Sequence, residues 1–314
     1  MTVKCAISGS ALSMKYDDPK GIFQNKQRSY WALADVSFTL MQGETLAILG
    51  EAGSGKSTLA KILTGIENPT SGMLMINNQD VSSESDKNQV RRKRAIRMVF
   101  QDTLGSLNPS LSLGEILTEP LINLTKLDKL EQFNRVMEVI QLVGLKEEYL
   151  HRLPHTFSAG ERQRIAIARA LILDPVCIVA DEPLSALETS VQSQIVNLML
   201  RLQDELKLSY IIISHNLDVI KHMSDKVMVL SHGRVVEYGP TEKVLNNPKH
   251  PYTISLLQGE QAPLNKDGLD LDASVDYCVY CYRCLGSEDI CKTSKPIEKV
   301  VDERLLSCHK ISGE

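Results

Sequence analysis

The stretch "GEAGSGKS" (residues 50–57) fits the pattern G-x-x-x-x-G-K-[ST] and decides the fold. It follows the apolar segment "TLAILG" (45–50) and leads into "GKSTLAKILTG" (55–65), a helical pattern that ends at Gly65. A strand, a glycine-rich turn and a helix N-terminus form a phosphate site, because backbone N–H groups and the helix dipole point at the anion. A glycine-rich turn without a ligand is the alternative, but the flanking strand and helix favour nucleotide binding.

The residues of this turn suit separate tasks in phosphate binding. Glycines let backbone N–H groups converge on one anion, a lysine adds positive charge for the outer phosphates, and a serine hydroxyl can bind Mg²⁺. The predicted nucleotide-binding residues here are Gly50, Gly53, Ser54, Gly55, Lys56, Ser57 and Thr58.

Two carboxylates follow a second apolar segment, "VCIVAD" (176–181), which is typical of a buried strand. Asp181 ends the segment and Glu182 comes next. An aspartate at the carboxyl end of a strand can hold Mg²⁺ through water, and the adjacent carboxylate can activate a water against a γ-phosphate. Two acids after a strand usually belong to a solvated loop, but the glycine-rich turn favours the catalytic interpretation.

The apolar pattern along the chain predicts an α/β fold with a parallel sheet. A third apolar strand, "YIIIS" (210–214), follows a helical pattern over 190–206, and strand, helix, strand is the unit of such a sheet. The region 102–175 predicts helices and no clear strand, so we expect a helical subdomain inserted there. Within "LEQFNRVMEVIQLVGL" (130–145), helical spacing places five apolar residues on one face: Phe133, Val136, Met137, Ile140 and Val143.

Composition narrows the class of protein. The 314 residues are 43% hydrophobic and 24% charged with a net charge of −4, which is ordinary for a globular chain and weighs against a nucleic-acid partner. No apolar run approaches the roughly 18 residues of a membrane span, and the first residues make a poor signal peptide. We therefore expect a cytosolic chain, whose thiols stay reduced.

Cysteines gather near the end of the chain. "DYCVYCYRCLGSEDIC" (276–291) holds four of the seven, and Cys308 follows. In a reducing compartment such a group favours metal ligands or redox groups over disulfides. Taken by themselves, the C-x₂-C spacings that Cys281 forms with Cys278 and with Cys284 would fit a zinc site. The isolated Cys5 and Cys177 are expected to be packed side chains.

The polar segment "APLNKDGLDLDASVD" (262–276) is typical of a linker. We therefore expect a nucleotide-binding domain over 1–257. A linker and a small cysteine-rich extension that binds a metal or cluster would occupy 258–314.

Four further stretches make the sequence resemble the ATP-binding subunits of ABC transporters. "FSAGERQRIAIARAL" (157–171) looks like the family's signature, LSGGQ followed by a helix. "FQDTLGSLNP" (100–109) looks like the Q-loop, "SALE" (185–188) stands where the D-loop belongs, and "IISHNL" (212–217) supplies a histidine after a strand. Each stretch is weak alone, but their order and separations are very specific.

The resemblance implies a P-loop ATPase with defined roles for its residues. Gln101, Glu182 and His215 would be catalytic, and Ser57, Gln101 and Asp181 would hold Mg²⁺. A second chain would face the γ-phosphate with its own signature and D-loop. The matching residues here, which would act in the partner's site, are Ser158, Gly160 and Glu188. The adenine-stacking aromatic would be Tyr16, with Tyr30 and Trp31 as alternatives.

Other stretches resemble the ATPases of dipeptide and oligopeptide importers, and those of importers linked to antimicrobial-peptide resistance. They include "NNPKHPYTISLL" (246–257), "GSLNP", "LSYIIISHNL" and the cysteine-bearing tail. The resemblance implies an ATPase that powers peptide import from the cytoplasmic face of the bacterial inner membrane. It would pair with a second ATPase chain on two permease subunits, with an external solute-binding protein acting indirectly. It also implies a [4Fe–4S] cluster on Cys278, Cys284, Cys291 and Cys308, with zinc as the alternative and Cys281 as an extra thiol.

The sequence departs from the family pattern at three positions. The signature has Ala159 and Glu161 where the family has glycine and glutamine, and the D-loop has Glu188 for aspartate. We expect the ATP site that uses this chain's signature to hydrolyse more slowly than the site built on its own glycine-rich turn. The alternatives are a regulatory subunit with little hydrolysis and a soluble ABC ATPase without a transport role.

Overall fold

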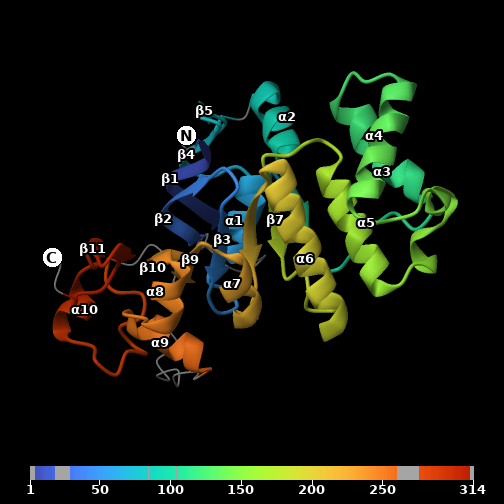
Figure 1. Ribbon diagram of the computed structural model, residues 1–314. Coiled ribbons are helices and arrows are strands. Elements are labelled where there is room, and N and C mark those ends of the chain that lie inside the picture. The colour runs from blue at the N-terminus through green and yellow to red at the C-terminus, as the bar shows by residue number, and fades with distance from the viewer. Residues whose placement is uncertain (1–3, 18–28, 84, 104, 260–275, 312–314) are drawn as a thin grey trace, which may run out of the picture.

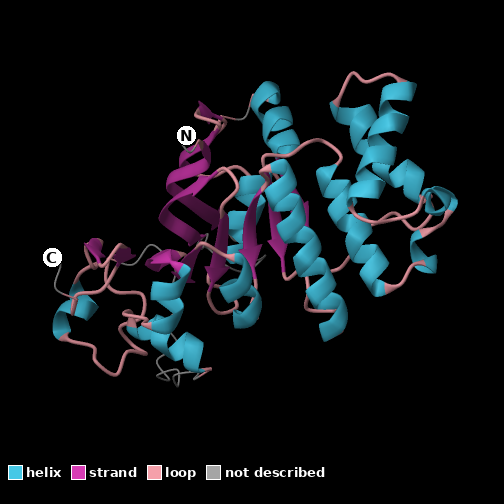
Figure 2. Ribbon diagram, viewed as in Figure 1, coloured by secondary structure: helices cyan, strands magenta, loops and turns pink. Residues whose placement is uncertain are grey.

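The computed structural model describes residues 4–17, 29–83, 85–103, 105–259 and 276–311. These residues form an eight-stranded sheet in the order β11-β12-β10-β9-β3-β8-β7-β6 and a four-stranded sheet in the order β2-β1-β4-β5. Figure 2 shows the strands at the centre of the molecule, with a group of helices at one end.

The core of the larger sheet is parallel, as predicted. Its parallel strands are β3 (Thr45–Leu49), β6 (Ile96–Val99), β7 (Cys177–Asp181), β8 (Ser209–Ile213) and β9 (Lys226–Ser231). Every residue of β3 and β8 is buried. These strands read as continuous apolar runs because helices cover both of their faces.

Alternate residues of one strand show this covering directly. Ile178 and Ala180 of β7 pack in an apolar cluster with α6 (Thr189–Leu206). Cys177 and Val179 pack in another cluster with α1 (Lys56–Thr64). Since successive side chains of a strand point to opposite faces, α1 and α6 lie on opposite sides of the sheet. Cys177 is thus a packed core residue, as expected.

Antiparallel strands not predicted from the sequence extend the larger sheet and make up the whole of the smaller one. In the larger sheet these are β10 (Arg234–Pro240), β11 (Lys299–Val301) and β12 (Arg304–Leu306). In the smaller sheet they are β1 (Cys5–Asp17), β2 (Ser29–Met41), β4 (Ser71–Ile76) and β5 (Gln79–Asp80). Register shifts interrupt the pairing of β1 with β2, so the alternation of apolar and polar residues is broken there.

The described residues between 102 and 175 contain helices and no strand, as predicted. The helices are α3 (Leu113–Leu124), α4 (Lys129–Leu142), α5 (Ala159–Leu171) and two short 3₁₀ turns, η1 (Glu147–His151) and η2 (Pro154–Thr156). In Figure 1 the longer helices stand side by side at one end of the molecule. The remaining helices are α2 (Asp86–Ala95), α7 (Leu217–Met223), α8 (Thr241–Asn246), α9 (Pro251–Gln258) and α10 (Asp289–Thr293).

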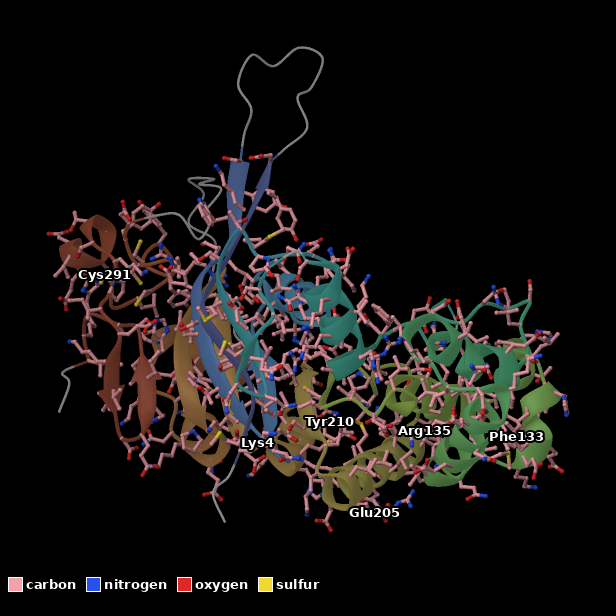
Figure 3. All side chains as sticks on the ribbon, turned by 90° about the horizontal axis from the view of Figure 1, so that it is seen from above. Lys4, Phe133, Arg135, Glu205, Tyr210 and Cys291 are labelled. Carbon is pink, nitrogen blue, oxygen red and sulfur yellow. The ribbon has the colours of Figure 1, made fainter. Side chains whose placement is uncertain are left out.

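The prediction for the buried face of α4 is wrong at one residue. Val136, Val139 and Ile140 are buried, whereas Phe133 is 51% exposed. The helix is rotated so that Val139 faces the core, and Figure 3 shows Phe133 near the outer end of the helical region. The apolar spacing was compatible with either rotation, and packing against α3 and α5 selects one.

The cysteine-rich segment 276–311 joins the larger sheet instead of standing apart from it. Strand β12 pairs antiparallel with β10. Cys278, Val279 and Cys281 pack in one apolar cluster with Leu49 of β3 and Val229 of β9. The expected boundary at 257/258 adjoins residues 260–275, which lie outside the described part of the chain. Figures 1 and 3 place this segment, with Cys291, at the end of the molecule opposite α3 and α4.

Candidate nucleotide-binding and hydrolysis site

A cavity of about 470 Å³ opens at the carboxyl ends of the central strands. Its lining includes the predicted residues Gly53, Ser54, Gly55, Lys56, Ser57, Thr58, Gln101, Asp181, Glu182 and His215. These residues meet because the parallel strands β3, β7 and β8 are neighbours, so the turns that follow them share one edge of the sheet.

Two positions of the turn require glycine because the backbone of another segment passes close to them. Gly50 has φ 153°, and a Cβ there would lie 2.3 Å from the Leu230 carbonyl oxygen. Gly55 has φ 103°, and a Cβ there would lie 2.7 Å from the Ala32 carbonyl oxygen. No side chain fits at either position. Gly50 does not line the cavity, and its role is to let the turn cross β9.

The Lys56 ammonium lies within the turn. Its Nζ donates to the carbonyl oxygens of Gly50 at 2.8 Å and Glu51 at 2.7 Å. Only 9% of the residue is exposed, and burial lowers the pKa of Lys56, against the attraction of Asp181 and Glu182. The charge is thus placed among backbone groups at the floor of the cavity, where a phosphate would complete its coordination.

Glu182 is held in an unusual backbone conformation. Its φ is 47°, and its N–H donates to the Ile213 carbonyl oxygen at 2.8 Å. Its Oε1 is 3.5 Å from His215 Nε2 and is buried without a hydrogen bond among the described residues. Burial raises the pKa of Glu182, and that of its neighbour Asp181. A buried carboxylate oxygen with free acceptor capacity and a raised pKa can accept a proton from an attacking water.

The donor set fits Mg²⁺ bound together with a nucleotide. The Ser57 hydroxyl, the Asp181 carboxylate and the Gln101 amide all line the cavity. Mg²⁺ is usually held by one or two carboxylates together with phosphate oxygens and water, and not by a cage of protein ligands.

The signature and D-loop residues do not reach this cavity. Ser158 caps α5, and its N–H and Oγ donate to Glu161 Oε2 at 2.8 and 2.9 Å. Gly160 packs against α6, since a Cβ there would lie 2.8 Å from Val191 Cγ1. Glu188 is the N-cap residue of α6. Of the predicted nucleotide-binding residues, Ser158, Gly160 and Glu188 therefore stand outside the chain's own nucleotide cavity.

The position of Glu161 changes the expected effect of its charge. The expected slow hydrolysis at the site that uses this signature depends on the negative charge that Glu161 adds near a γ-phosphate. In the structure the Glu161 carboxylate turns back to the cap, and the backbone N–H of Ser158 lowers its pKa. The signature therefore carries the negative charge of Glu161, but hydrogen bonds from Ser158 fix the position of this carboxylate at the N-terminus of α5.

The aromatic residues are arranged differently from the leading prediction. Tyr30 and Trp31 line the cavity, whereas Tyr16 does not. The Tyr16 hydroxyl is bonded to the Glu67 carboxylate, and its ring lies 5.6 Å from that of Tyr30. Burial raises the pKa of Tyr16 to about 12. Of the three candidates, Tyr30 and Trp31 are therefore the residues that border the cavity, and the ring of Tyr16 lies next to that of Tyr30.

Two contacts to the glycine-rich turn were missed by the sequence analysis. The β9–β10 turn brings His232 into the cavity lining, and the Gly233 N–H donates to the Ser54 carbonyl oxygen at 2.9 Å. Arg283 of the cysteine-rich segment pairs with Glu51. These residues lie far from the turn in sequence, and neither carries a local motif.

Cys278, Cys281 and Cys291 belong to one apolar cluster, but no three His, Cys, Asp or Glu side chains in the described part of the chain are grouped so as to hold a metal ion. Cys278, Cys281, Cys291 and Cys308 are buried and Cys284 is half-buried, all as free thiols. The Cys278 N–H donates to the Cys291 carbonyl oxygen at 3.0 Å. Burial raises the pKa of Cys278 to about 12, with smaller contributions from Cys281, Cys291 and Cys308.

Comparison with known proteins decides the family. Residues 33–185 match the family model described as ABC transporter. The dipeptide transport ATP-binding protein DppF of Escherichia coli is 49% identical over 314 residues, covering 96% of this chain and 93% of that protein. The chain belongs to the ATP-binding subunits of ABC transporters. It is therefore an ATPase with the P-loop fold of that family.

Two further similarities agree with this assignment. A dipeptide transport ATP-binding protein of Haemophilus influenzae is 42% identical, covering 97% of this ABC subunit and 96% of that protein. A dimeric structure of the ATP-binding cassette MJ0796, in a post-hydrolysis state with ADP and Pi, superposes with a TM-score of 0.64. It is 28% identical, covering 75% of this subunit and 98% of that chain. Within the described ranges, no helix of the subunit combines the length and apolarity of a membrane span.

Proposed function

We propose that this ABC subunit hydrolyses ATP to power peptide import across the bacterial inner membrane. The main structural support for ATP hydrolysis is the cavity at one edge of the sheet, which is lined by Lys56, Asp181, Glu182 and His215. The peptide cargo is supported by identities of 42% and 49% to dipeptide transport ATP-binding proteins along nearly the whole chain.

Hydrolysis proceeds by attack of a water on the γ-phosphorus of ATP. Glu182 accepts the water's proton, the bond from the γ-phosphorus to the β,γ-bridging oxygen breaks, and ADP leaves with that electron pair. Lys56 binds the β- and γ-phosphate oxygens, and His215 positions the γ-phosphate beside Glu182. Ser57 and Asp181, with Gln101 nearby, would hold Mg²⁺, which would supply positive charge to neutralise the phosphates.

A second ATPase chain completes the site. The signature residues Ser158 and Gly160 and the D-loop residue Glu188 do not line the chain's own cavity. A signature helix from another chain must therefore face the γ-phosphate, which supports a dimer like that of the MJ0796 cassette. We propose a heterodimer with a second ATPase, in which this subunit's signature serves the partner's ATP.

We propose that one of the two permease subunits docks on a separate groove of about 370 Å³ beside the Q-loop, and that the other docks on the partner ATPase. Ile66 and Phe100 line it and are 55% and 42% exposed, with Lys93, Arg97 and Arg169 around them. Phe100 of the groove directly precedes Gln101 of the nucleotide cavity, so a helix bound in the groove can affect the position of Gln101. This docking places the subunit at the cytoplasmic face of the membrane, where a solute-binding protein acts on it only through the permeases.

We also propose a [4Fe–4S] cluster on Cys278, Cys284, Cys291 and Cys308. The Cys278 N–H donates to the Cys291 carbonyl oxygen, which brings the backbones of two of these four cysteines together. The spacing Cys278-x₅-Cys284-x₆-Cys291-x₁₆-Cys308 resembles that of the peptide-importer ATPases, and this resemblance favours iron–sulfur over zinc.

Anaerobic purification followed by iron, acid-labile sulfide and zinc analysis tests the cluster. About four irons and four sulfides per chain, lost in Cys284→Ser, are expected. One zinc without iron would overturn the cluster and leave the ATPase assignment intact.

Uptake in the assembled transporter tests the cargo. Vesicles containing both ATPases and both permeases should accumulate a labelled dipeptide only with ATP and the binding protein. Glu182→Gln in this subunit should abolish accumulation. Undiminished hydrolysis and uptake with this variant would favour the regulatory alternative, and hydrolysis without uptake of any peptide would favour another cargo.

A further inference from the structure

Glu51, the second residue of the glycine-rich turn, is tied to the rest of the molecule at three points. Its carbonyl oxygen accepts a hydrogen bond from Lys56 Nζ at 2.7 Å. Its N–H donates to the Tyr252 hydroxyl of α9 at 2.8 Å. Its carboxylate accepts two hydrogen bonds from Arg283, at 2.6 and 2.8 Å. Two of the three ties therefore come from the C-terminal part of the chain.

Arg283 is well placed to hold this carboxylate. It lies between Cys281 and Cys284, and only 11% of its side chain is exposed. Its guanidinium lies 5.8 Å from the centre of the Tyr280 ring, and that ring packs edge-on against Tyr252 at 5.2 Å. A bidentate arginine–carboxylate pair fixes both distance and orientation, so the position of Arg283 is transmitted to Glu51.

We propose that Arg283 is a positioning residue for ATP, through which the cysteine-rich segment sets the nucleotide affinity of the glycine-rich turn. Arg283 pairs with the Glu51 carboxylate, and the Glu51 carbonyl oxygen is one of those that accept a hydrogen bond from the Lys56 ammonium. Whatever orders Cys281 and Cys284 therefore also orders the loop that binds phosphate. The proposal uses the ATP site that family membership establishes and does not depend on the cargo or on what the thiols bind.

A second ion pair between the same two parts of the chain provides a matched control. Lys295 of the cysteine-rich segment pairs with Asp35 of β2 at 2.9 Å, with side chains 42% and 60% exposed. It joins segment and core without touching the glycine-rich turn. If Arg283 only helped to dock the segment, Lys295→Gln and Arg283→Gln would act alike.

The test measures ATP binding and turnover in the assembled transporter for Arg283→Gln, Glu51→Gln, the double variant, Arg283→Lys and Lys295→Gln. We expect Arg283→Gln to raise the KM and Kd for ATP about tenfold with kcat nearly unchanged. Arg283→Lys should recover part of the loss, and Lys295→Gln should bind like the unmodified chain. The double variant should bind no worse than Glu51→Gln, because Arg283 acts through that carboxylate. Unchanged affinity in Arg283→Gln, or additive losses in the double variant, would overturn the proposal.

Hydrogen exchange gives a readout that docking alone would not change. Coupling between two sites is reciprocal, so nucleotide binding should increase amide protection around residues 278–284. We expect this increase in the unmodified chain and in Lys295→Gln, and its loss in Arg283→Gln under saturating nucleotide. Equal protection in all three proteins would contradict the coupling, even if Arg283→Gln were less stable overall.

Discussion

Glu182 and His215 meet across the carboxyl ends of β7 and β8, with Glu182 Oε1 3.5 Å from His215 Nε2. Neither strand carries both groups, and only the parallel pairing of the two strands brings them together. The left-handed backbone of Glu182 turns its side chain into the cavity, where the oxygen nearest the histidine is buried without a hydrogen bond. Strain of this kind persists only where the surrounding structure enforces it.

Replacing this carboxylate should separate binding from hydrolysis. Glu182→Gln keeps the size of the side chain but removes the proton acceptor, so turnover at this subunit's own ATP site should fall about 100-fold or more. The measurement is ATP turnover in a transporter whose partner ATPase carries the matching glutamine substitution, so that only this site hydrolyses. ATP should still bind, because Lys56 and the turn are unchanged. Glu205→Gln, at an exposed position of α6, is the control and should leave turnover unchanged. Turnover above a tenth of normal in Glu182→Gln would exclude the proposed base.

The same substitution should stabilise the fold in a pH-dependent way. Burial raises the pKa of Glu182, so the folded state holds the proton more tightly than the unfolded state. Above the folded-state pKa the buried charge is unfavourable, and below the unfolded-state pKa both states are neutral. Glu182→Gln should therefore raise the melting temperature near pH 7, and this gain should vanish as pH falls below the ordinary glutamate pKa. A gain that is independent of pH would point to packing instead.

The altered signature can be tested at Glu161. Glutamine also forms the capping box with Ser158, so Glu161→Gln should leave the melting temperature nearly unchanged. Removing the charge near the partner's γ-phosphate should raise hydrolysis at the partner's site by about threefold, the effect of roughly 0.7 kcal/mol. The measurement is ATP turnover in a transporter that also carries Glu182→Gln, which silences the other site. Unchanged or lower turnover would show that the slow-site hypothesis is wrong.

The link between the cysteine-rich segment and the sheet depends on a buried ion pair. Arg304 and Glu237 are fully buried, and Arg304 Nη1 lies 3.4 Å from Glu237 Oε1. Glu237 also accepts hydrogen bonds from the N–H groups of Lys249 and His250. Arg304→Met leaves a buried charge without its partner, and the cost is about 3–5 kcal/mol.

Chemical unfolding would measure this loss. The double variant Arg304→Met with Glu237→Gln should recover much of it, since the uncompensated charge is then gone. A loss below about 1 kcal/mol for Arg304→Met would show that water reaches Glu237.

The sequence predicted the parallel strands and the phosphate site because their signals are local. A buried parallel strand is a continuous apolar run, and the glycines, Lys56 and Ser57 lie within one turn. Asp181 and His215 follow such runs, so their meeting at one sheet edge could be inferred from topology alone.

Features that depend on distant contacts could not be predicted in the same way. The Arg283–Glu51 pair spans 232 positions and has no periodic signature. The rotation of α4 that exposes Phe133 is selected by neighbouring helices, and its spacing fits either face. Tyr16 was the leading aromatic candidate, but the pairing of β1 with β2 places Tyr30 and Trp31 in the cavity lining instead.

The most direct test of the central claim is ATP-driven uptake of a labelled dipeptide by vesicles that contain this subunit, its partner ATPase and both permeases. Uptake should require ATP and the binding protein, and should disappear with Glu182→Gln in this subunit while nucleotide binding persists. Dipeptide uptake that continues unchanged with the Glu182→Gln subunit would contradict the account.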